Sequence, residues 1–295
     1  MGPCRLAETS PLPAHLEALN AGSRADFMTA LGSIFEHAPW VAEQAYNRRP
    51  FATVAAAHMA MMEVLRQADA GQRLAVIRAH PELGSKVARI DLTAASQAEQ
   101  GSLGLDRLGA EEFARFTRLN AAYRKRFGFP FIICVRRHTR DSILRQFERR
   151  LGNDVETEQT TALAEIGLIT RLRLVSAIEG PGKPVTDGRL TTHVLDLVRG
   201  EAAAGVKLAL YEVGASARGL LREAITNAQG RTEAALIDGE PLRIGTYEMQ
   251  FHIGDYFGAG FLGVVPVRFS IAEPESHYHV PLLATPWSYS TYRGS

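Results

Sequence analysis

The chain has 295 residues, of which 46% are hydrophobic and 22% are charged, and its formal net charge is +1. This length favours two domains. So small a net charge excludes a whole-chain field that would attract nucleic acid or an anionic membrane. Two cysteines, Cys4 and Cys134, make neither a disulfide framework nor a zinc cluster. Because no apolar stretch reaches the roughly 18 residues of a membrane helix, we expect a soluble, cytoplasmic protein.

The first half of the chain shows the period of α-helices, with apolar residues three and four positions apart. Helices are predicted in the segments that begin at Ser23, Thr53 and Asn153, and over residues 72–79, 111–127 and 139–151. The helix over 72–79 should end at His80, because Pro81 disfavours the α conformation in the residue before it. We therefore predict an all-α domain over residues 1–177, in which 129–135 is the one candidate for a strand.

The period changes in the second half of the chain. Residues 178–188 are rich in proline and glycine, which is typical of a linker. Beyond them apolar and polar residues alternate over 206–211, 247–253 and 265–271, as in half-buried strands. Several short strands with turns between them predict a two-sheet β sandwich over 189–295. The predicted fold class is thus multi-domain, an all-α domain followed by an all-β sandwich.

Three histidines of the β half are candidates for a functional site. His277 and His279 stand two residues apart, so that they share one face of a strand, and His193 is distant in sequence. Such a set could hold zinc, with water as the fourth ligand. It could also act without a metal, with an imidazole as general base and Arg231 polarising a carbonyl. Any of these histidines taken alone is more often a surface residue, and spacing does not separate the three interpretations.

The α half has candidates of its own. His80 stands where a helix must end, and the simplest interpretation is a histidine favoured by the helix dipole. Ser96 and Glu99 have the spacing of a capping box, with Ser96 as the N-cap. Arg171 and Arg173 are two residues apart in an apolar helix and therefore lie on different faces. An arginine that points inward there would need an anionic partner.

Three motifs of the β half belong together. They are Leu-Thr-Thr-His-Val-Leu-Asp at 190–196, Thr-Asn-Ala-Gln-Gly-Arg at 226–231, and His-Tyr-His-Val-Pro-Leu-Leu at 277–283 with a terminal Tyr-Arg-Gly-Ser. The set resembles 5-hydroxyisourate hydrolase, the transthyretin-related enzyme family. The resemblance implies a metal-free hydrolase and a homotetramer with sites at subunit interfaces. The catalytic residues that it implies are His193, Arg231, His279 and Ser295, with Tyr292, Arg293 and Gly294 of the tail binding substrate and His277 flanking the site.

Four motifs of the α half resemble a second family. They are Ala-His-Pro-Glu-Leu-Gly at 79–84, Ser-Gln-Ala-Glu-Gln at 96–100, the segment 119–133 with its Phe-Gly-Phe-Pro-Phe, and the helix 164–174. Together they resemble 2-oxo-4-hydroxy-4-carboxy-5-ureidoimidazoline (OHCU) decarboxylase, which implies a cofactor-free decarboxylase with dimer contacts through this domain. The resemblance makes His80 the acid/base, and Arg171 is the alternative to Arg173 among the substrate contacts. It also makes Glu99 catalytic, and Glu99 would bind the ureidoimidazoline together with Ser96, Gln100 and Arg173.

The two resemblances imply consecutive reactions, because the product of the hydrolase is the substrate of the decarboxylase. We therefore predict a bifunctional enzyme of purine metabolism that degrades 5-hydroxyisourate to (S)-allantoin with no cofactor and no metal. Its expected partners are small-molecule substrates and further copies of itself, with no nucleic acid and no membrane. Two alternatives are a transthyretin-like carrier with a degenerate decarboxylase domain, and a zinc-dependent cyclic-amide hydrolase.

Overall fold

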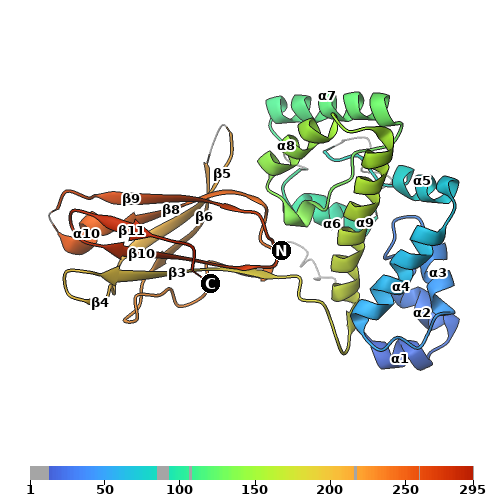
Figure 1. The fold of residues 1–295 in the computed structure, drawn as a ribbon, viewed down its shortest axis with the longest axis horizontal. Coiled ribbons are helices and arrows are strands. Elements are labelled where there is room, and N and C mark those ends of the chain that lie inside the picture. The colour runs from blue at the N-terminus through green and yellow to red at the C-terminus, as the bar shows by residue number, and fades with distance from the viewer. Residues whose placement is uncertain (1–12, 85–92, 106–107, 216–217, 259, 295) are drawn as a thin grey trace, which may run out of the picture. The chain divides into compact units, whose positions relative to one another are not determined.

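The computed structural model describes residues 13–84, 93–105, 108–215, 218–258 and 260–294. The chain divides into two compact units. Unit 1 comprises residues 1–96, 123–133 and 154–184, and unit 2 comprises 97–122, 134–153 and 185–295. A helical first half and a β-sheet second half are both present, which confirms the predicted fold class (Figure 1). The domain boundaries at 177 and 189 stay a prediction.

The helices of the first half start where short polar side chains can cap them. Ser23 and Asp26 form a capping box at the start of α2, and Thr53 and Asp154 cap α4 and α9. Asp69 does the same for α5. The helices are α1 (Leu16–Ala21), α2 (Arg24–Leu31), α3 (Pro39–Tyr46), α4 (Val54–Gln67), α5 (Ala70–Arg78), α6 (Ala94–Ser102), α7 (Ala110–Phe127), α8 (Arg140–Arg150) and α9 (Val155–Ala177).

The predicted capping box at Ser96 is wrong. Helix α6 begins two residues earlier, at Ala94, and the hydroxyl of Thr93 accepts the hydrogen bond from the backbone N–H of Ser96 at 3.3 Å. The hydroxyl of Ser96 is therefore not needed at the helix start. It lies buried and bonds a distant carboxylate, as described below.

The apolar segment 129–135 forms no strand, contrary to the one strand expected as a candidate in the α half. Phe129 and Phe131 are buried and pack edge-on against Tyr123, with ring centroids 5.9 and 5.2 Å apart. A 3₁₀ helix, η2 (Val135–Arg137), follows. The run is apolar because it packs against helices, and a short buried run cannot be assigned to a strand by composition alone.

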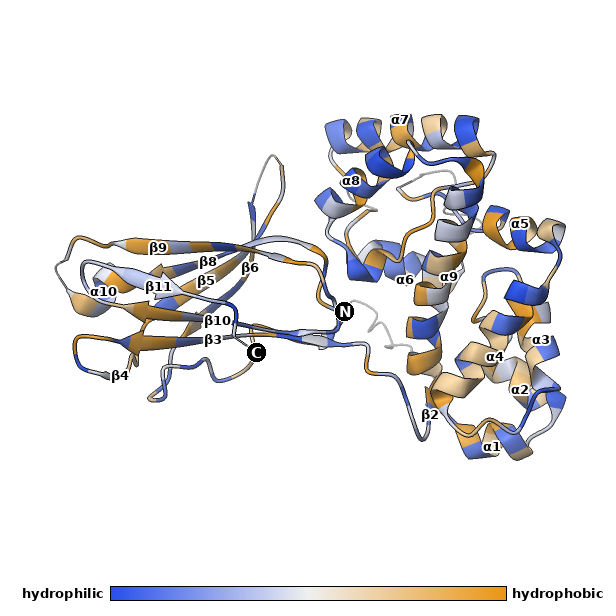
Figure 2. Cartoon of the chain, viewed as in Figure 1, coloured by the Kyte–Doolittle hydropathy of each residue, from blue (hydrophilic) through white to orange (hydrophobic). Residues whose placement is uncertain are grey.

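Helix α7 illustrates why the helical prediction succeeds. Its acidic residues Glu111 and Glu112 lie in the first turn and its basic residues in the last, which complements the helix dipole. Hydrophilic and hydrophobic residues alternate along it with the helical period (Figure 2).

A two-residue strand, β1 (Ala14–His15), also pairs in parallel with β2 (Ile178–Glu179) in unit 1.

The β half forms two sheets in unit 2. One has the order β11-β10-β3-β4, with β7 also paired to β3, and the other has the order β6-β5-β8-β9. The elements are β3 (Gly188–Asp196), β4 (Glu201–Ala202), β5 (Lys207–Val213), β6 (Arg218–Ile225), β7 (Ile237–Glu240), β8 (Gly245–His252), α10 (Ile253–Phe257), β9 (Val264–Ile271), β10 (His277–Ala284) and β11 (Tyr289–Thr291).

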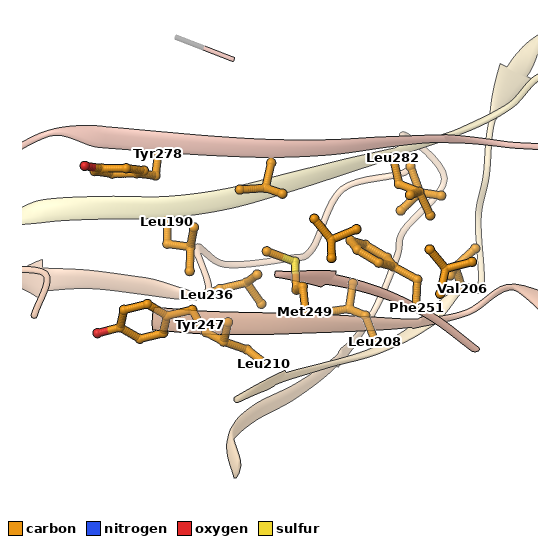
Figure 3. Close-up of a cluster of buried hydrophobic side chains, with 14 of the residues drawn as sticks. Leu190, Val206, Leu208, Leu210, Leu236, Tyr247, Met249, Phe251, Tyr278 and Leu282 are labelled. Carbon is orange, nitrogen blue, oxygen red and sulfur yellow. The ribbon is translucent and has the colours of Figure 1, made fainter. Parts of the chain in front are cut away.

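The core of the β half lies between these two sheets. Figure 3 shows Tyr278 and Leu282 of β10 facing Met249 and Phe251 of β8. All four side chains are at most 4% exposed. Because side chains alternate along a strand, His277 and His279 lie on the other face of β10. Among the described residues, no helix is long and apolar enough to cross a membrane.

Candidate active sites

The three candidate histidines of the β half gather on the outer face of the sheet that contains β3 and β10. These strands run parallel, and their register pairs His279 with Thr191 and Pro281 with His193. The hydroxyl of Thr191 lies within hydrogen-bond distance of both His277 and His279. The two histidines therefore share one face of β10, as alternation predicted.

Arg231 reaches this face through a tight turn. It forms an isolated β-bridge with His193, and the amide side chain of Asn227 accepts hydrogen bonds from the backbone N–H groups of Gln229 and Arg231 at 3.0 and 3.2 Å. Gly230 adopts a φ of +69°, and a Cβ there would lie 2.3 Å from the carbonyl oxygen of Val194. Only glycine fits this close approach without strain.

The C-terminal tail lies over His279. The backbone N–H of Gly294 donates to the carbonyl oxygen of His279 at 2.8 Å. The guanidinium of Arg293 lies 4.3 Å from the ring centroid of Tyr278 and bonds Glu273 at 3.1 Å, and Tyr292 is exposed. Substrate binding by Tyr292, Arg293 and Gly294 stays a prediction. Ser295, the fourth predicted catalytic residue of this half, lies outside the described residues.

Replacing Gly294 with alanine should impair the β-half site. A Cβ at this position would lie 2.7 Å from His279 Cδ2, so that either the tail or the ring must move. Because misplacement of a reacting group by about 1 Å can reduce a rate about 100-fold, we expect a loss of that order in turnover at this site. The matched control is Gly219→Ala, where a Cβ would meet nothing within 4 Å. Equal turnover in the two variants would contradict the tail's role.

Both imidazoles nearest Arg231 are held neutral. Burial lowers the pKa of His193 and the charge of Arg231 lowers it further, against a hydrogen bond with the backbone of Gln229. Burial also lowers the pKa of His279, followed by the charges of Arg231 and of the two neighbouring histidines. Near neutral pH each ring therefore keeps a nitrogen lone pair that can accept a proton. Within the described ranges, no three His, Cys, Asp or Glu side chains are placed to hold a metal ion.

Thr191 is a residue that the sequence reasoning missed. Its Oγ1 lies 2.8 Å from His277 Nε2 and 2.9 Å from His279 Nδ1. The available signal was its place two residues before His193, which puts it on the same face of β3. Pairing of β3 with β10 could not be foreseen, because the strands are distant in sequence.

The α half brings Arg173 and Ser96 together around a buried carboxylate, Glu36, in unit 1. Glu36 Oε2 accepts from Arg173 Nη1 at 2.8 Å and from Ser96 Oγ at 3.0 Å, and Arg173 Nη2 donates to Ser96 Oγ at 3.1 Å. The side chain of Glu36 is fully buried and that of Arg173 is 8% exposed. Charge-assisted bonds of this kind hold a guanidinium in one orientation.

Glu36 is the second residue that the sequence reasoning missed. Burial alone raises the pKa of its carboxyl, but hydrogen bonds from Thr93, Arg173 and Ser96 and the charge of Arg173 outweigh burial, so that the pKa lies below its ordinary value. The next residue, His37, has a φ of +50°, which is uncommon outside glycine. An inward-facing arginine was expected to need an anionic partner, and Glu36 is that partner.

His80 lies two residues after the end of α5, and one of its ring nitrogens is hydrogen-bonded. Its Nδ1 is 3.0 Å from the carbonyl oxygen of Val76, so that this nitrogen donates. Its Nε2 is buried and has no hydrogen-bond partner among the described residues. Burial lowers the pKa of His80 to about 4, against the hydrogen bond with Val76 and the charge of Glu36, which both raise it. Buried polar atoms are normally paired, so the neutral Nε2 is available to a bound molecule.

The structure distinguishes the two arginines of α9. Arg173 contacts Glu36 and Ser96, whereas Arg171 lowers the pKa of His58, whose Nε2 lies 3.0 Å from Thr170 Oγ1. Glu99 and Gln100 follow Ser96 on α6 and are half-buried. Glu99 stands three positions after Ser96 and therefore lies on a neighbouring part of the same helix surface. Its role stays a prediction.

The neutral histidines of unit 1 should make the chain acid-sensitive. The pKa values of His58 and His80 are both lowered from 6.5 to about 4. Below about pH 6.5 the unfolded chain takes up protons that the folded chain excludes, so the free energy of unfolding falls until about pH 4. The expected slope is at most about 1.4 kcal/mol per pH unit for each histidine.

Urea unfolding followed by circular dichroism near pH 7.5, 6 and 5 measures this slope. His58→Gln is the matched variant. It removes one of the two titrating imidazoles, so it should reduce the slope by at most about 1.4 kcal/mol per pH unit. A stability that does not change between pH 6.5 and 5 would contradict the burial of neutral imidazoles.

Comparison with known proteins defines the class to which this fold and these sites belong. The family model of OHCU decarboxylase matches residues 20–175, and that of the HIUase/Transthyretin family matches residues 190–294. The chain is thus a fusion of two domains that occur separately elsewhere. It belongs to the OHCU decarboxylase family, and a domain of the HIUase/transthyretin family follows in the same chain.

Individual relatives agree with this division. An OHCU decarboxylase of Haloferax volcanii is 42% identical over 159 residues, covering 54% of this chain and 93% of the relative. A 5-hydroxyisourate hydrolase of Deinococcus radiodurans is 52% identical over 113 residues, covering 36% of this chain and 95% of the relative. The crystal structure of an (S)-allantoin synthase matches with a TM-score of 0.52 and 33% identity, over 96% of this chain and all of the other.

Proposed function

We propose that the chain is a bifunctional enzyme of urate degradation. Its β domain hydrolyses 5-hydroxyisourate to OHCU, and its α domain decarboxylates OHCU to (S)-allantoin. One observation carries the proposal: the motif side chains of each family are gathered in the corresponding half. His193 and His279 meet Arg231 in one half, and Ser96 and Arg173 meet in the other.

In the hydrolase, the neutral imidazoles act as general bases. His279 and His193 activate the water, and His279 takes its proton as the water attacks the ring amide of 5-hydroxyisourate. Arg231, beside both rings, binds the substrate and stabilises the negative charge that develops on the carbonyl oxygen. Ser295 assists from the tail. Burial and the charge of Arg231 keep both histidines unprotonated, as the general base requires.

In the decarboxylase, His80 is the acid/base. Its Nε2, which has no hydrogen-bond partner among the described residues, accepts a proton from the substrate hydroxyl, and the departing carboxylate leaves its electrons in the conjugated ring. Return of the proton to one face of the ring sets the chirality of the product. Arg173 and Ser96 contact the substrate with Glu99 and Gln100, and Glu36 holds the guanidinium of Arg173 in place.

The chain is also proposed to form homo-oligomers, with tetramer contacts through the β domain and dimer contacts through the α domain. Strand β11 is an edge strand and is exposed along its whole length, and Trp287 just before it is 68% exposed. Unpaired edges of this kind favour association with another chain. Sedimentation velocity of the purified chain tests the proposal, and a monomer at all concentrations would overturn it.

Circular dichroism of the product stream tests the proposed activities. Freshly generated 5-hydroxyisourate is given to the purified chain, and the expected product is (S)-allantoin with little racemate. If 5-hydroxyisourate decays at its spontaneous rate while the chain binds it, the chain is a carrier. Metal analysis of the same sample addresses the zinc alternative, which requires stoichiometric zinc that is lost together with activity.

A further inference from the structure

The hydroxyl of Thr191 lies between two imidazoles and can connect them. Thr191 Oγ1 is 2.8 Å from His277 Nε2 and 2.9 Å from His279 Nδ1. A hydroxyl carries one proton, so it can donate to one ring while it accepts from the other. The parallel register that pairs His279 with Thr191 fixes this arrangement through the backbone. The three groups therefore form a continuous hydrogen-bonded chain.

The surroundings of the two rings differ in charge. His279 lies near Arg231 and His193, and both disfavour a positive charge on it. His277 is exposed and lines a surface hollow together with Asp187, Asp238 and Glu275. A single arginine, Arg189, also lines this hollow. The charge of Arg231 therefore disfavours a proton on His279, whereas His277 offers an exposed ring from which solvent can take a proton.

We propose that Thr191 and His277 form a proton relay that carries the proton taken up by His279 to the protein surface. The proposal rests on the proposed hydrolase function, in which His279 is the general base. Neither Thr191 nor His277 needs to touch the substrate. Both act through His279 and are positioning residues.

The transfer is balanced at every atom. Before reaction, His279 Nδ1 donates its proton to Thr191 Oγ1, and the Thr191 hydroxyl donates to the lone pair of His277 Nε2. When His279 Nε2 takes a proton from the attacking water, the Nδ1 proton passes to Thr191 and the Thr191 proton passes to His277. His279 ends neutral as its other tautomer, and His277 ends as an imidazolium that loses its proton to solvent. No bond other than N–H and O–H forms or breaks in the relay.

The relay also explains why the neutral ring of His279 must carry its proton on Nδ1. A general base must present an unprotonated Nε2, which requires the proton on Nδ1. An acceptor at Thr191 Oγ1 stabilises that tautomer, because it receives the Nδ1 hydrogen bond. A valine in place of Thr191 keeps the shape of the side chain but removes both the acceptor and the donor.

Hydrolysis kinetics with added buffer test the relay in the full chain. We expect His277→Gln to lower turnover of 5-hydroxyisourate about 10- to 100-fold, as when the partner that orients a functional histidine is lost. Added imidazole should restore the rate in proportion to its concentration, because a small base can take the proton from Thr191. The wild type should show no such dependence. His279→Ala reports the uncatalysed effect of imidazole, and His252→Gln is the control for loss of a half-buried histidine on the other sheet.

Variants of Thr191 separate the hydroxyl from the shape of the side chain. Thr191→Val should lose turnover to a similar extent, whereas Thr191→Ser should retain most of it. Unchanged turnover in His277→Gln overturns the relay. A loss that imidazole does not restore also overturns it, because the residue then acts by shape or by binding.

Nitrogen-15 NMR of labelled histidines tests the same relay independently of activity. The expected result is a His279 ring with its proton on Nδ1 in the wild type, and a mixture of tautomers in Thr191→Val. A wild-type His279 with its proton on Nε2 would overturn the relay. If the wild type does not hydrolyse 5-hydroxyisourate, the proposed function fails, and the tautomer measurement still decides whether the hydrogen-bonded chain exists.

Discussion

A full-length chain with His279 replaced by alanine is expected to leave 5-hydroxyisourate to decay at close to its spontaneous rate. The reason is the loss of the neutral imidazole that accepts the proton of water beside Arg231. Loss of a positioned general base typically lowers a rate about 10²- to 10⁴-fold. The loss of absorbance of the substrate measures the rate. Decarboxylation of OHCU supplied directly should be unaffected, because His279 belongs to the β-domain site.

The matched variant, His80→Ala, should have the opposite pattern. Hydrolysis of 5-hydroxyisourate is expected to proceed normally, while OHCU accumulates and decays to racemic allantoin. Circular dichroism distinguishes this outcome from the (S)-allantoin of the wild type. If both variants lose the same single activity, the assignment of one reaction to each half is wrong.

Replacing Arg173 with methionine is expected to abolish decarboxylation and to destabilise the chain. The substitution leaves the carboxylate of Glu36 buried without its cation. Breaking a buried ion pair by removing one partner costs about 3–5 kcal/mol of the free energy of unfolding. Urea unfolding measures the stability, and the decarboxylation of OHCU below the unfolding transition measures the activity.

Two further variants separate stability from function. Arg171→Met is the matched control on the same helix and should leave decarboxylation intact, since Arg171 lies near His58 instead of Glu36. The double variant Glu36→Leu with Arg173→Leu removes both charges, and such apolar replacements of buried pairs are often neutral for stability. It should regain stability without regaining activity. A double variant that decarboxylates at the wild-type rate would show that the pair serves the fold alone.

The fold class of each half was predictable because its apolar residues recur with a single period along the sequence. The repeat of three and four residues in the first half and the alternation in the second half decide which faces are buried. Caps such as Ser23 and Asp154 act within a few residues, so they were visible in the sequence as well. The capping box at Ser96 and the strand over 129–135 failed for a common reason. Both patterns are short, and tertiary contacts override short patterns.

The composition of the sites was predictable from motifs, but their assembly was not. His193, Arg231 and His279 stand in three separate motifs, as do Ser96 and Arg173 in the other half. Glu36 and Thr191 carry no motif of their own. Their importance comes from the neighbours that the folded chain brings within about 3 Å, which is the range of a hydrogen bond.

Local patterns in the sequence therefore determined most of the secondary structure, the two families and the candidate site residues. The tertiary structure alone decided that Arg173 contacts Glu36 and Ser96 while Arg171 does not. It also decided that His277 and His279 share the hydroxyl of Thr191. The physical reason is that periodicity and caps act over a few residues, whereas a buried charge or a shared proton depends on the partners that distant segments supply.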